Sequence, residues 1–410
     1  MARRKYRSSG LCPAVAVLLF VAVYAFLLYR LFPDDSTVDD ISSIRERDED
    51  KDELCAKSCP CPPPEPRRCV EKTNFVFVKM HKCATEMLTS VFHRYGDERD
   101  LEFVIPRAPL GEWYLGWPYP ITKQIYRPSK SGSFNIMCEH VVFDKAAMSK
   151  VMLEDTVYVT ILREPFSHFK SSFNFHGVAR LAGIRGDDPM DEFFRAPSPY
   201  DDIYVSTLKA GIPNGISVTR NFLAHDLGYP RQQWENMTYA KEFVKYIDQE
   251  FYLVMILEHL MESLLLLKRL MCWEIQDLLH YPINIMAYGY KNDRPGYLIK
   301  KHKNWSKVDY MLYDFFNKTL WEKIKKQDRN FFEELEYFKR VQNATIAYCY
   351  SSDTTPLVLE GSKFSHAITI TRHYCMRMMR NTPQYLGDVF KRRYEGTEYT
   401  IHKLWPWINV

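Results

Sequence analysis

Several familiar functional signatures are missing from this sequence of 410 residues. It has no G-x-x-x-x-G-K-[ST] loop, which excludes an ordinary ATP-binding P-loop, and no H-E-x-x-H motif of the kind that holds a catalytic zinc. No repeat and no heptad array is present, so a solenoid and a fibre are excluded. The formal net charge is only +4, and the basic residues are too dispersed to indicate a nucleic-acid partner.

The composition is that of a folded globular protein, with 46% hydrophobic and 26% charged residues. Its N-terminus is different, because Leu11 to Tyr29 contains no charged residue and would span roughly 28 Å as a helix. Basic residues precede this run and acidic residues follow it, which puts residues 1–10 in the cytosol. We therefore predict a cytosolic tail at 1–10 and a transmembrane signal anchor at 11–32. A cleaved signal peptide is the alternative, but no small-x-small cleavage site ends the run.

Residues 33–72 have the composition of a stem, acidic at first and then rich in cysteine and proline. Its four cysteines could bind zinc, but in a lumenal setting disulfides are favoured: Cys55, Cys59, Cys61 and Cys69. Nine cysteines follow the anchor, so at least one is free or pairs with another chain, which would allow a homodimer. Four N-x-[ST] sequons fit lumenal exposure: Asn236, Asn304, Asn317 and Asn343.

The body of the chain alternates apolar strands with helical patterns. Strands are predicted at 73–79, 134–138, 156–162 and 251–257. Helical patterns follow at 87–95, from 166, at 259–273 and at 306–340. This order predicts an α/β fold with a central, mainly parallel sheet flanked by helices. We expect a catalytic domain at 73–345 and a C-terminal extension at 346–410 that packs on it.

The strand-loop-helix unit at 74–95 is the first candidate site. Such a loop lies at the carboxyl end of its strand and at the positive end of the following helix, where phosphate or sulfate binds readily. Lys82 and Thr85 supply an ammonium group and a hydroxyl there. The alternative is a solvated surface lysine.

The second candidate unit is ILREPFSHFKSS, residues 161–172. A buried strand delivers Arg163 to its carboxyl end, and Ser171 follows eight residues later. Arginine can bind a phosphate through two parallel hydrogen bonds, and a serine hydroxyl can complete the site. A structural salt bridge is the alternative for Arg163.

Together these units resemble the Golgi carbohydrate sulfotransferase superfamily. VFVKMHKCAT resembles its 5′-phosphosulfate loop, and LREPFSHFKSS resembles its 3′-phosphate motif. Three further stretches are similar to the galactose 3-O-sulfotransferase and galactosylceramide sulfotransferase family: residues 220–228, 252–279 and 316–321. With them, the resemblance covers roughly residues 72–345.

The resemblance implies a P-loop-like sulfotransferase fold and a Golgi membrane enzyme of type II topology with a lumenal catalytic domain. The implied donor is 3′-phosphoadenosine 5′-phosphosulfate, and the implied acceptor is galactose, at its 3-hydroxyl, in a glycolipid or glycan. Lys82 would stabilise the bridging oxygen, while Cys83, Ala84 and Thr85 hold the 5′-phosphate. Arg163 and Ser171 would hold the 3′-phosphate. This chemistry requires no metal, so none is expected to be essential.

A sugar hydroxyl needs a general base. His140 is the first candidate, because it follows the predicted strand 134–138 and its segment resembles the place where uronyl 2-O-sulfotransferases carry a catalytic histidine. His81 is the second candidate, and Glu139 and His176 are weaker ones. The aromatic stretch at 113–119 could stack on a sugar ring or could simply pack its loop.

The loop departs from the family pattern H-K-T-A-S-S at two informative positions. Cys83 replaces threonine and could be an unpaired thiol, and Glu86 replaces a hydroxyl residue and brings a negative charge. We expect Glu86 to point outward along the helix. Two alternatives stay open: a sulfotransferase for a uronic acid or hexosamine, and a silent glycan-binding relative, which Glu86 favours. A kinase would need a pair of metal-binding carboxylates, and the sequence has no such signature.

Overall fold

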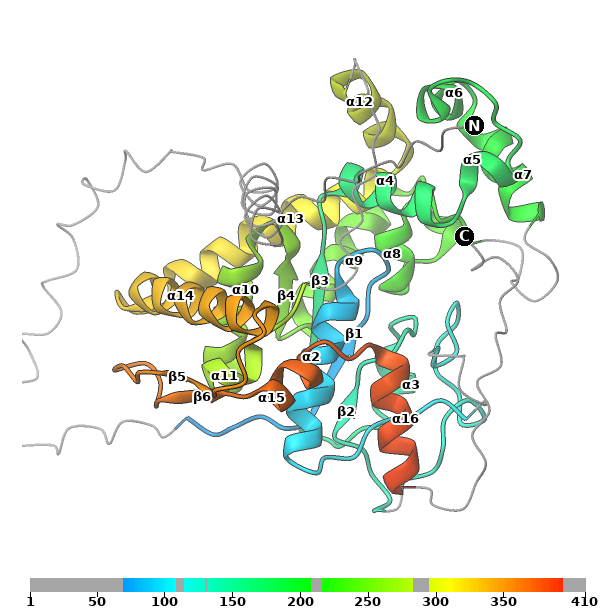
Figure 1. The fold of residues 1–410 in the computed structure, drawn as a ribbon. Helices are drawn as coiled ribbons and strands as arrows, with labels where there is room; N and C mark the ends of the chain where they lie inside the picture. The colour runs from blue at the N-terminus through cyan, green and yellow to red at the C-terminus, as the bar shows by residue number, and fades with distance from the viewer. Residues whose placement is uncertain (1–68, 108–113, 130, 208–215, 283–294, 394–410) are drawn as a thin grey trace, which may run out of the picture. The chain divides into compact units, whose positions relative to one another are not determined.

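A computed structural model describes residues 69–107, 114–129, 131–207, 216–282 and 295–393 (Figure 1). The predicted cytosolic tail, the membrane anchor and nearly all of the stem lie outside the described residues. From Val70 onward the chain forms one compact unit. Within the described ranges, no helix is both long enough and apolar enough to cross a membrane.

The centre of the fold is a parallel sheet of four strands in the order β2-β1-β3-β4. Phe75 lies opposite Ile136 on one side and Val157 on the other. All four strands fall within the predicted ranges: β1 (Phe75–Val78), β2 (Ile136–Met137), β3 (Val157–Leu162) and β4 (Leu253–Ile256). Because helices flank the sheet, its strands are almost entirely buried and apolar, which confirms the prediction of a parallel α/β sheet.

Helices make up most of the remaining described residues. The first half of the chain contributes α2 (Thr85–Glu98), α3 (Lys145–Met148), α4 (Pro165–Phe175), α5 (Val178–Leu181), α6 (Pro189–Arg195), α7 (Pro197–Thr207) and α8 (Phe222–Asp226). The second half contributes α9 (Met237–Glu250), α10 (Leu260–Met271), α11 (Ile275–Leu278), α12 (Pro295–Trp305), α13 (Lys307–Lys325) and α14 (Phe331–Tyr350). Short 3₁₀ helices are η1 (Arg231–Gln233) and η2 (Leu257–His259).

The C-terminal extension has regular structure of its own. The predicted boundary at residue 345 falls inside α14, which ends at Tyr350. An antiparallel hairpin follows, formed by β5 (Leu357–Leu359) and β6 (Ile368–Ile370), and then α15 (Arg372–Met378) and α16 (Thr382–Arg393). In Figure 1, α15 and α16 lie along α2, the helix that follows the first candidate loop.

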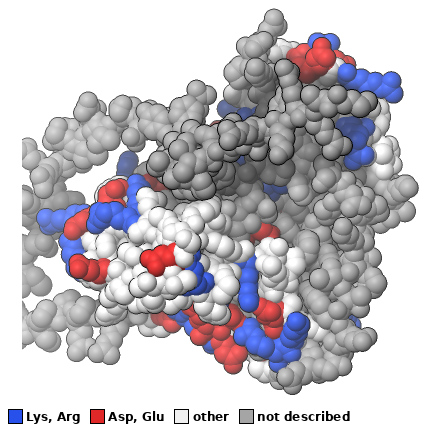
Figure 2. All heavy atoms as spheres, in the orientation of Figure 1, with Lys and Arg blue, Asp and Glu red and all other residues white. Residues whose placement is uncertain are grey.

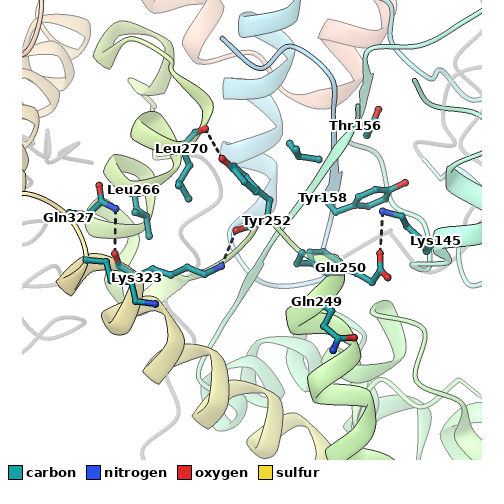
Figure 3. Close-up of a pocket in the computed structure, with 13 residues that line it drawn as sticks. Lys145, Thr156, Tyr158, Gln249, Glu250, Tyr252, Leu266, Leu270, Lys323 and Gln327 are labelled. Atoms are coloured by element: carbon teal, nitrogen blue, oxygen red, sulfur yellow. Dashed lines mark hydrogen bonds and ion pairs between the residues drawn. The ribbon is translucent and has the colours of Figure 1, made fainter. Parts of the chain in front are cut away.

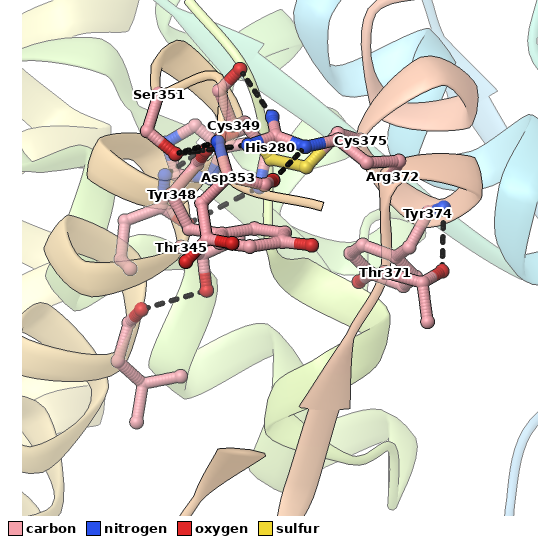
Figure 4. The surroundings of a disulfide bond; sticks show 12 residues. His280, Thr345, Tyr348, Cys349, Ser351, Asp353, Thr371, Arg372, Tyr374 and Cys375 are labelled. Carbon is pink, nitrogen blue, oxygen red and sulfur yellow. Dashed lines mark hydrogen bonds between the residues drawn. A yellow bond between two sulfur atoms is a disulfide. The ribbon is translucent and has the colours of Figure 1, made fainter. Parts of the chain in front are cut away.

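A disulfide between Cys349 and Cys375 joins the end of α14 to α15, with the two Cα atoms 5.4 Å apart (Figure 4). Cys69 and Cys272 are also disulfide-bonded, as the disulfide alternative for the stem predicts for Cys69. The other three stem cysteines lie outside the described residues. Cys83 and Cys138 are buried free thiols, and the first of these is the unpaired thiol suggested by the sequence.

The strand order determines where a ligand should bind. From β1 the chain first moves to β2 on one side and later to β3 and β4 on the other side, so the order reverses between β1 and β3. In open parallel sheets, ligands bind at the carboxyl ends of the strands at such a switch point. The two loops at this point carry Lys82 and Arg163. Elsewhere, on the face shown in Figure 2, basic and acidic side chains are interspersed.

Candidate functional site

The loop between β1 and α2 has an unusual backbone. Lys82 and Ala84 both have left-handed conformations, with φ of 57° and 54°. Ala84 is the N-cap of α2 and makes no side-chain hydrogen bond to the helix. Its carbonyl oxygen accepts from the N–H of Met87 at 3.2 Å, so the cap leaves the N–H groups of Thr85 and Glu86 without an acceptor. By contrast, the start of α4 is capped by Glu164, whose carboxylate accepts from the N–H groups of Phe166 and Ser167. An anion would therefore find open N–H groups at α2 rather than at α4.

Two cations meet at this loop. Arg163 donates from Nη1 to the carbonyl oxygen of Lys82 at 3.0 Å. The ammonium group of Lys82 lies 3.5 Å from the centre of the Phe175 ring. Burial, together with the nearby Arg163, lowers the pKa of Lys82 to about 8. Among the described residues, neither cation forms an ion pair with a carboxylate, so the pair offers its charge to an anionic ligand.

The other residues predicted to bind the donor lie in the same loop or on α4. Thr85 is buried and donates its hydroxyl proton to the carbonyl oxygen of Met80 at 2.9 Å, so its backbone N–H is the donor left for a ligand. Cys83 is buried and Ala84 is exposed, and burial raises the pKa of the Cys83 thiol. Ser171 is buried on α4, the helix that begins just after Arg163. The roles of these four residues remain predictions.

His140 and His81 stack against each other, with ring centres 4.0 Å apart. The Nδ1 atom of His140 lies 3.0 Å from the carbonyl oxygen of Lys79. Because a carbonyl can only accept, Nδ1 carries the proton and Nε2 keeps its lone pair. Burial, together with the neighbouring His81, lowers the pKa of His140 well below its ordinary value, so the ring is neutral at neutral pH. His140 is partly exposed, whereas His81 is buried.

Asp226 holds His81 and was not singled out from the sequence, although it lies in the stretch 220–228 that carried the family resemblance. Its Oδ2 atom is 2.8 Å from both Nδ1 and the backbone nitrogen of His81. Its Oδ1 atom accepts from the Trp117 indole at 2.8 Å. Burial would raise the pKa of Asp226, but contact with His81 outweighs it and the pKa is lowered. Asp226 is therefore a buried carboxylate that orients His81 and its loop.

The aromatic stretch, for which sugar stacking and loop packing were the alternatives, packs on these histidines. The ring of Tyr114 lies 5.3 Å from that of His140, and the ring of Trp117 lies 4.4 Å from that of His81. Trp113 falls outside the described residues. The weaker base candidate His176 ends α4, with its ring 5.9 Å from that of Phe222, and burial lowers its pKa.

Lys79, predicted only as the last residue of the first strand, carries a buried charge next to the loop. Its side chain is 1% exposed, and its ammonium group lies 3.1 Å from Glu86 and 3.6 Å from Glu139. Burial would lower its pKa, but the two carboxylates outweigh burial and the pKa is raised. Glu139, the other weaker base candidate, also lies 2.9 Å from Nε2 of His93. It is therefore engaged in a buried ion pair below the loop.

Glu86 does not extend freely along the helix, contrary to our expectation. Its carboxylate contacts Lys79 and accepts a hydrogen bond from the backbone N–H of Thr382 at 2.9 Å. Burial alone would raise the pKa of Glu86, but Lys79 and Thr382 lower it to about 2. The negative charge that seemed unfavourable beside a phosphate site is thus matched by a buried ammonium group.

One group of the described residues could supply metal ligands: His93, Cys138 and Glu139, whose ligand atoms lie within 4.8 Å of one another. A metal ion there would have to be held beside the ammonium group of Lys79, which is 3.6 Å from Glu139. We interpret these side chains as part of a buried polar cluster around Lys79, whose ammonium group already contacts Glu139.

A cavity of about 530 Å³ lies at the opposite edge of the sheet, near the starts of β3 and β4 (Figure 3). Two of the lysines that line it are paired within the protein. Lys145 contacts Glu250 at 3.2 Å, and Lys323 donates to the carbonyl oxygen of Tyr252 at 3.0 Å. Lys82, Arg163 and the neutral His140 lie at the other edge, so we assign the functional site there and not to this cavity.

Comparisons with known proteins agree with this geometry. A family model described as galactose-3-O-sulfotransferase matches residues 18–358. The chain is 30% identical to galactosylceramide sulfotransferase of Homo sapiens over 283 residues, which are 66% of this chain and 64% of that protein. It is 25% identical to galactose-3-O-sulfotransferase 2 of Mus musculus over 347 residues, 78% of this chain and 86% of that protein. The chain therefore belongs to the galactose-3-O-sulfotransferase family.

Proposed function

We propose that this protein transfers the sulfuryl group of 3′-phosphoadenosine 5′-phosphosulfate to the 3-hydroxyl of galactose in a glycolipid or a glycoprotein glycan. The observation that carries the proposal is the meeting of Lys82 and Arg163, which pair with no carboxylate in the described part of the chain, beside the start of α2, which has no side-chain cap. The family and the names of the relatives support galactose as the acceptor.

The cations bind and polarise the donor. Arg163, with Ser171, holds the 3′-phosphate, and the N–H groups of residues 83–85 hold the 5′-phosphate. Lys82 donates to the oxygen that bridges phosphorus and sulfur, where negative charge develops as the S–O bond breaks. Catalysis would then come chiefly from charges that are in place before the reaction, as in phosphoryl transfer.

His140 acts as the general base. Its Nε2 atom takes the proton of the galactose hydroxyl as the hydroxyl oxygen forms the new bond to sulfur. The old bond to the bridging oxygen breaks in line, and 3′-phosphoadenosine 5′-phosphate leaves. His81, held by Asp226, keeps the loop and the stacked ring of His140 in position. Tyr114 and Trp117 offer aromatic surface beside the base, on which the apolar face of galactose could stack.

The setting we propose is the Golgi membrane, with a single-pass type II anchor at 11–32 and a lumenal catalytic domain. The disulfide between Cys349 and Cys375 fits an oxidising lumen. Three sequon asparagines are exposed, as lumenal glycosylation would require: Asn236, Asn304 and Asn343. A homodimer linked through the stem cysteines remains part of the proposal.

Two alternatives can be weighed against the geometry. The only feature that favoured a silent glycan-binding relative was the negative charge of Glu86 near the phosphate site. Because Glu86 pairs with Lys79, that charge no longer argues against donor binding. A sulfotransferase for a uronic acid or hexosamine would use the same donor residues, so the acceptor must be tested directly.

The test is sulfate transfer by the full chain in detergent, with labelled donor and a panel of galactosides. The panel includes galactosylceramide, lactose-type and mucin-type acceptors, and 3-O-methyl galactosides. We expect label on galactosides, lost with the 3-O-methyl block and with Lys82→Ala, and unaffected by Lys300→Ala on the exposed face of α12. Transfer to uronic acids or hexosamines alone would contradict the galactose assignment, and donor binding without transfer would support the silent relative.

A further inference from the structure

We propose that the C-terminal segment 371–393 positions the donor loop through a buried link of Lys79, Glu86 and Thr382, in which Lys79 and Glu86 are positioning residues. The inference rests on the proposed function for its effect on the donor, but the link itself is a property of the fold. Residues 371–393 lie beyond the part of the chain that the family model matches, which ends at residue 358.

The segment is attached along the whole of α2. At the far end of the helix, Arg377 contacts Asp97 at 3.0 Å and Glu98 at 3.1 Å. In the middle, Ser90 donates to the carbonyl oxygen of Met378 at 3.1 Å. The covered face is polar yet almost fully buried, with four such residues: Thr89, Ser90, His93 and Arg94. The Cys349–Cys375 disulfide joins the same segment to α14. The segment is thus a fixed part of the site's surroundings.

Of the contacts between α2 and the C-terminal segment, the one made by Glu86 lies nearest the donor loop. It connects the N-terminus of α2 to the N-terminus of α16. Glu86 lies in the first turn of α2, and its carboxylate accepts from the N–H of Thr382, the first residue of α16. At the start of α16, the backbone N–H of Asn381 donates to the side chain of Gln384, and the backbone N–H of Gln384 donates to the side chain of Asn381. This reciprocal cap leaves the N–H of Thr382 for Glu86. A carboxylate at two helix N-termini is favourable for both dipoles. The hydroxyl of Thr382 lies 3.2 Å from the Lys79 ammonium group and completes the link.

The donor loop needs such support. Two of its non-glycine residues, Lys82 and Ala84, are left-handed, a conformation that persists only where the surroundings hold it. Lys79 and Glu86 lie on either side of this strained turn, three residues before Lys82 and two after Ala84. Their ion pair therefore closes the loop from both sides. The backbone carbonyl of Lys79 also receives the Nδ1 proton of His140, so the same residue ties the loop to the general base.

The experiment uses the full chain in detergent and two measurements. The first is hydrogen exchange of residues 80–90 without any ligand, and the second is binding of 3′-phosphoadenosine 5′-phosphate by calorimetry. Glu86→Gln keeps the shape of the side chain. Thr382→Pro removes both the N–H that Glu86 accepts from and the hydroxyl beside Lys79, at a helix position where proline is tolerated. For both variants we expect faster exchange and roughly tenfold weaker binding, with the KM of the acceptor unchanged. Glu98→Gln is the matched control. It weakens the contact of Arg377 with the far end of α2, and it should change neither the exchange of residues 80–90 nor the binding of the nucleotide.

A rescue distinguishes positioning from simple stability. Lys79→Met removes the cation shared by Glu86 and Glu139 and should weaken binding most. The double variant Lys79→Met/Glu86→Met removes one of the two stranded carboxylates and should recover the part of the loss that is due to Glu86. Unchanged exchange and binding in Glu86→Gln, or no recovery in the double variant, would overturn the inference. If the wild type does not bind the nucleotide but exchange still rises in Glu86→Gln, the link stands and the proposed function is wrong.

Discussion

The Nδ1 atom of His140 lies 3.0 Å from the carbonyl oxygen of Lys79, the residue that follows the central strand β1. This contact fixes the tautomer of His140, because the carbonyl has no proton to give. It also ties the proposed base to the strand that carries the proposed donor loop. His140 and this loop are therefore anchored to the same residue, although 61 positions separate Lys79 from His140 in the sequence.

His140→Ala should lower kcat by about 10²- to 10⁴-fold, the usual contribution of a general base. Binding of 3′-phosphoadenosine 5′-phosphate should change little, because His140 is not among the residues that hold the nucleotide. Single-turnover transfer and calorimetry measure the two effects separately. An equal loss in His81→Ala with full activity in His140→Ala would show that the buried ring is the base instead.

The pKa of Lys82, about 8, predicts an alkaline limb in the pH profile. Lys82 must be protonated to bind the donor, so kcat/KM for the donor should be constant below this pKa and fall as the pH rises through it. The limb in kcat should lie at higher pH, because the bound anion favours the ammonium form. Lys82→Arg should be less active but should lose the limb, since a guanidinium does not titrate in this range. An unchanged limb in Lys82→Arg would assign it to another group.

Arg163 should distinguish donors with and without a 3′-phosphate. Arg163→Met should lower kcat/KM for 3′-phosphoadenosine 5′-phosphosulfate by roughly ten- to a hundredfold, the effect of losing a charge-assisted hydrogen bond. Transfer from adenosine 5′-phosphosulfate, which has no 3′-phosphate, should be weak in the wild type and little changed in the variant. If both donors lose activity equally, Arg163 acts instead by holding the Lys82 carbonyl.

The disulfide between Cys349 and Cys375 closes a loop with a sequence separation of 26 residues. Removing it as Cys349→Ala/Cys375→Ala should lower the free energy of unfolding by about 3–4 kcal/mol, since the unfolded chain gains the entropy of an open loop. Denaturant unfolding followed by circular dichroism measures this change. Cys83→Ala, which removes a free thiol, is the control for loss of a buried sulfur. An unchanged free energy in the double variant would mean that α15 is held by its other contacts alone.

Much of the fold could be predicted because local patterns determine it. Buried parallel strands are continuous apolar runs, and all four could be located from the sequence, as could the helix at 259–273. The loops after β1 and β3 followed from those strands, since the carboxyl ends of parallel strands meet at one edge of a sheet. The meeting of Lys82 and Arg163 was therefore within reach of the sequence.

The sequence by itself thus determined the sheet, the position of the two loops proposed to bind the donor, the family and a short set of histidines. The tertiary structure alone decided how their charges are balanced. Asp226 lies 145 residues after His81, and Thr382 lies 296 residues after Glu86, so no local pattern could pair them. Burial then made each pairing matter, because a buried charge needs a partner that the fold must bring from elsewhere in the chain. The same glutamate that looked unfavourable in the sequence became a link between the donor loop and the C-terminal segment.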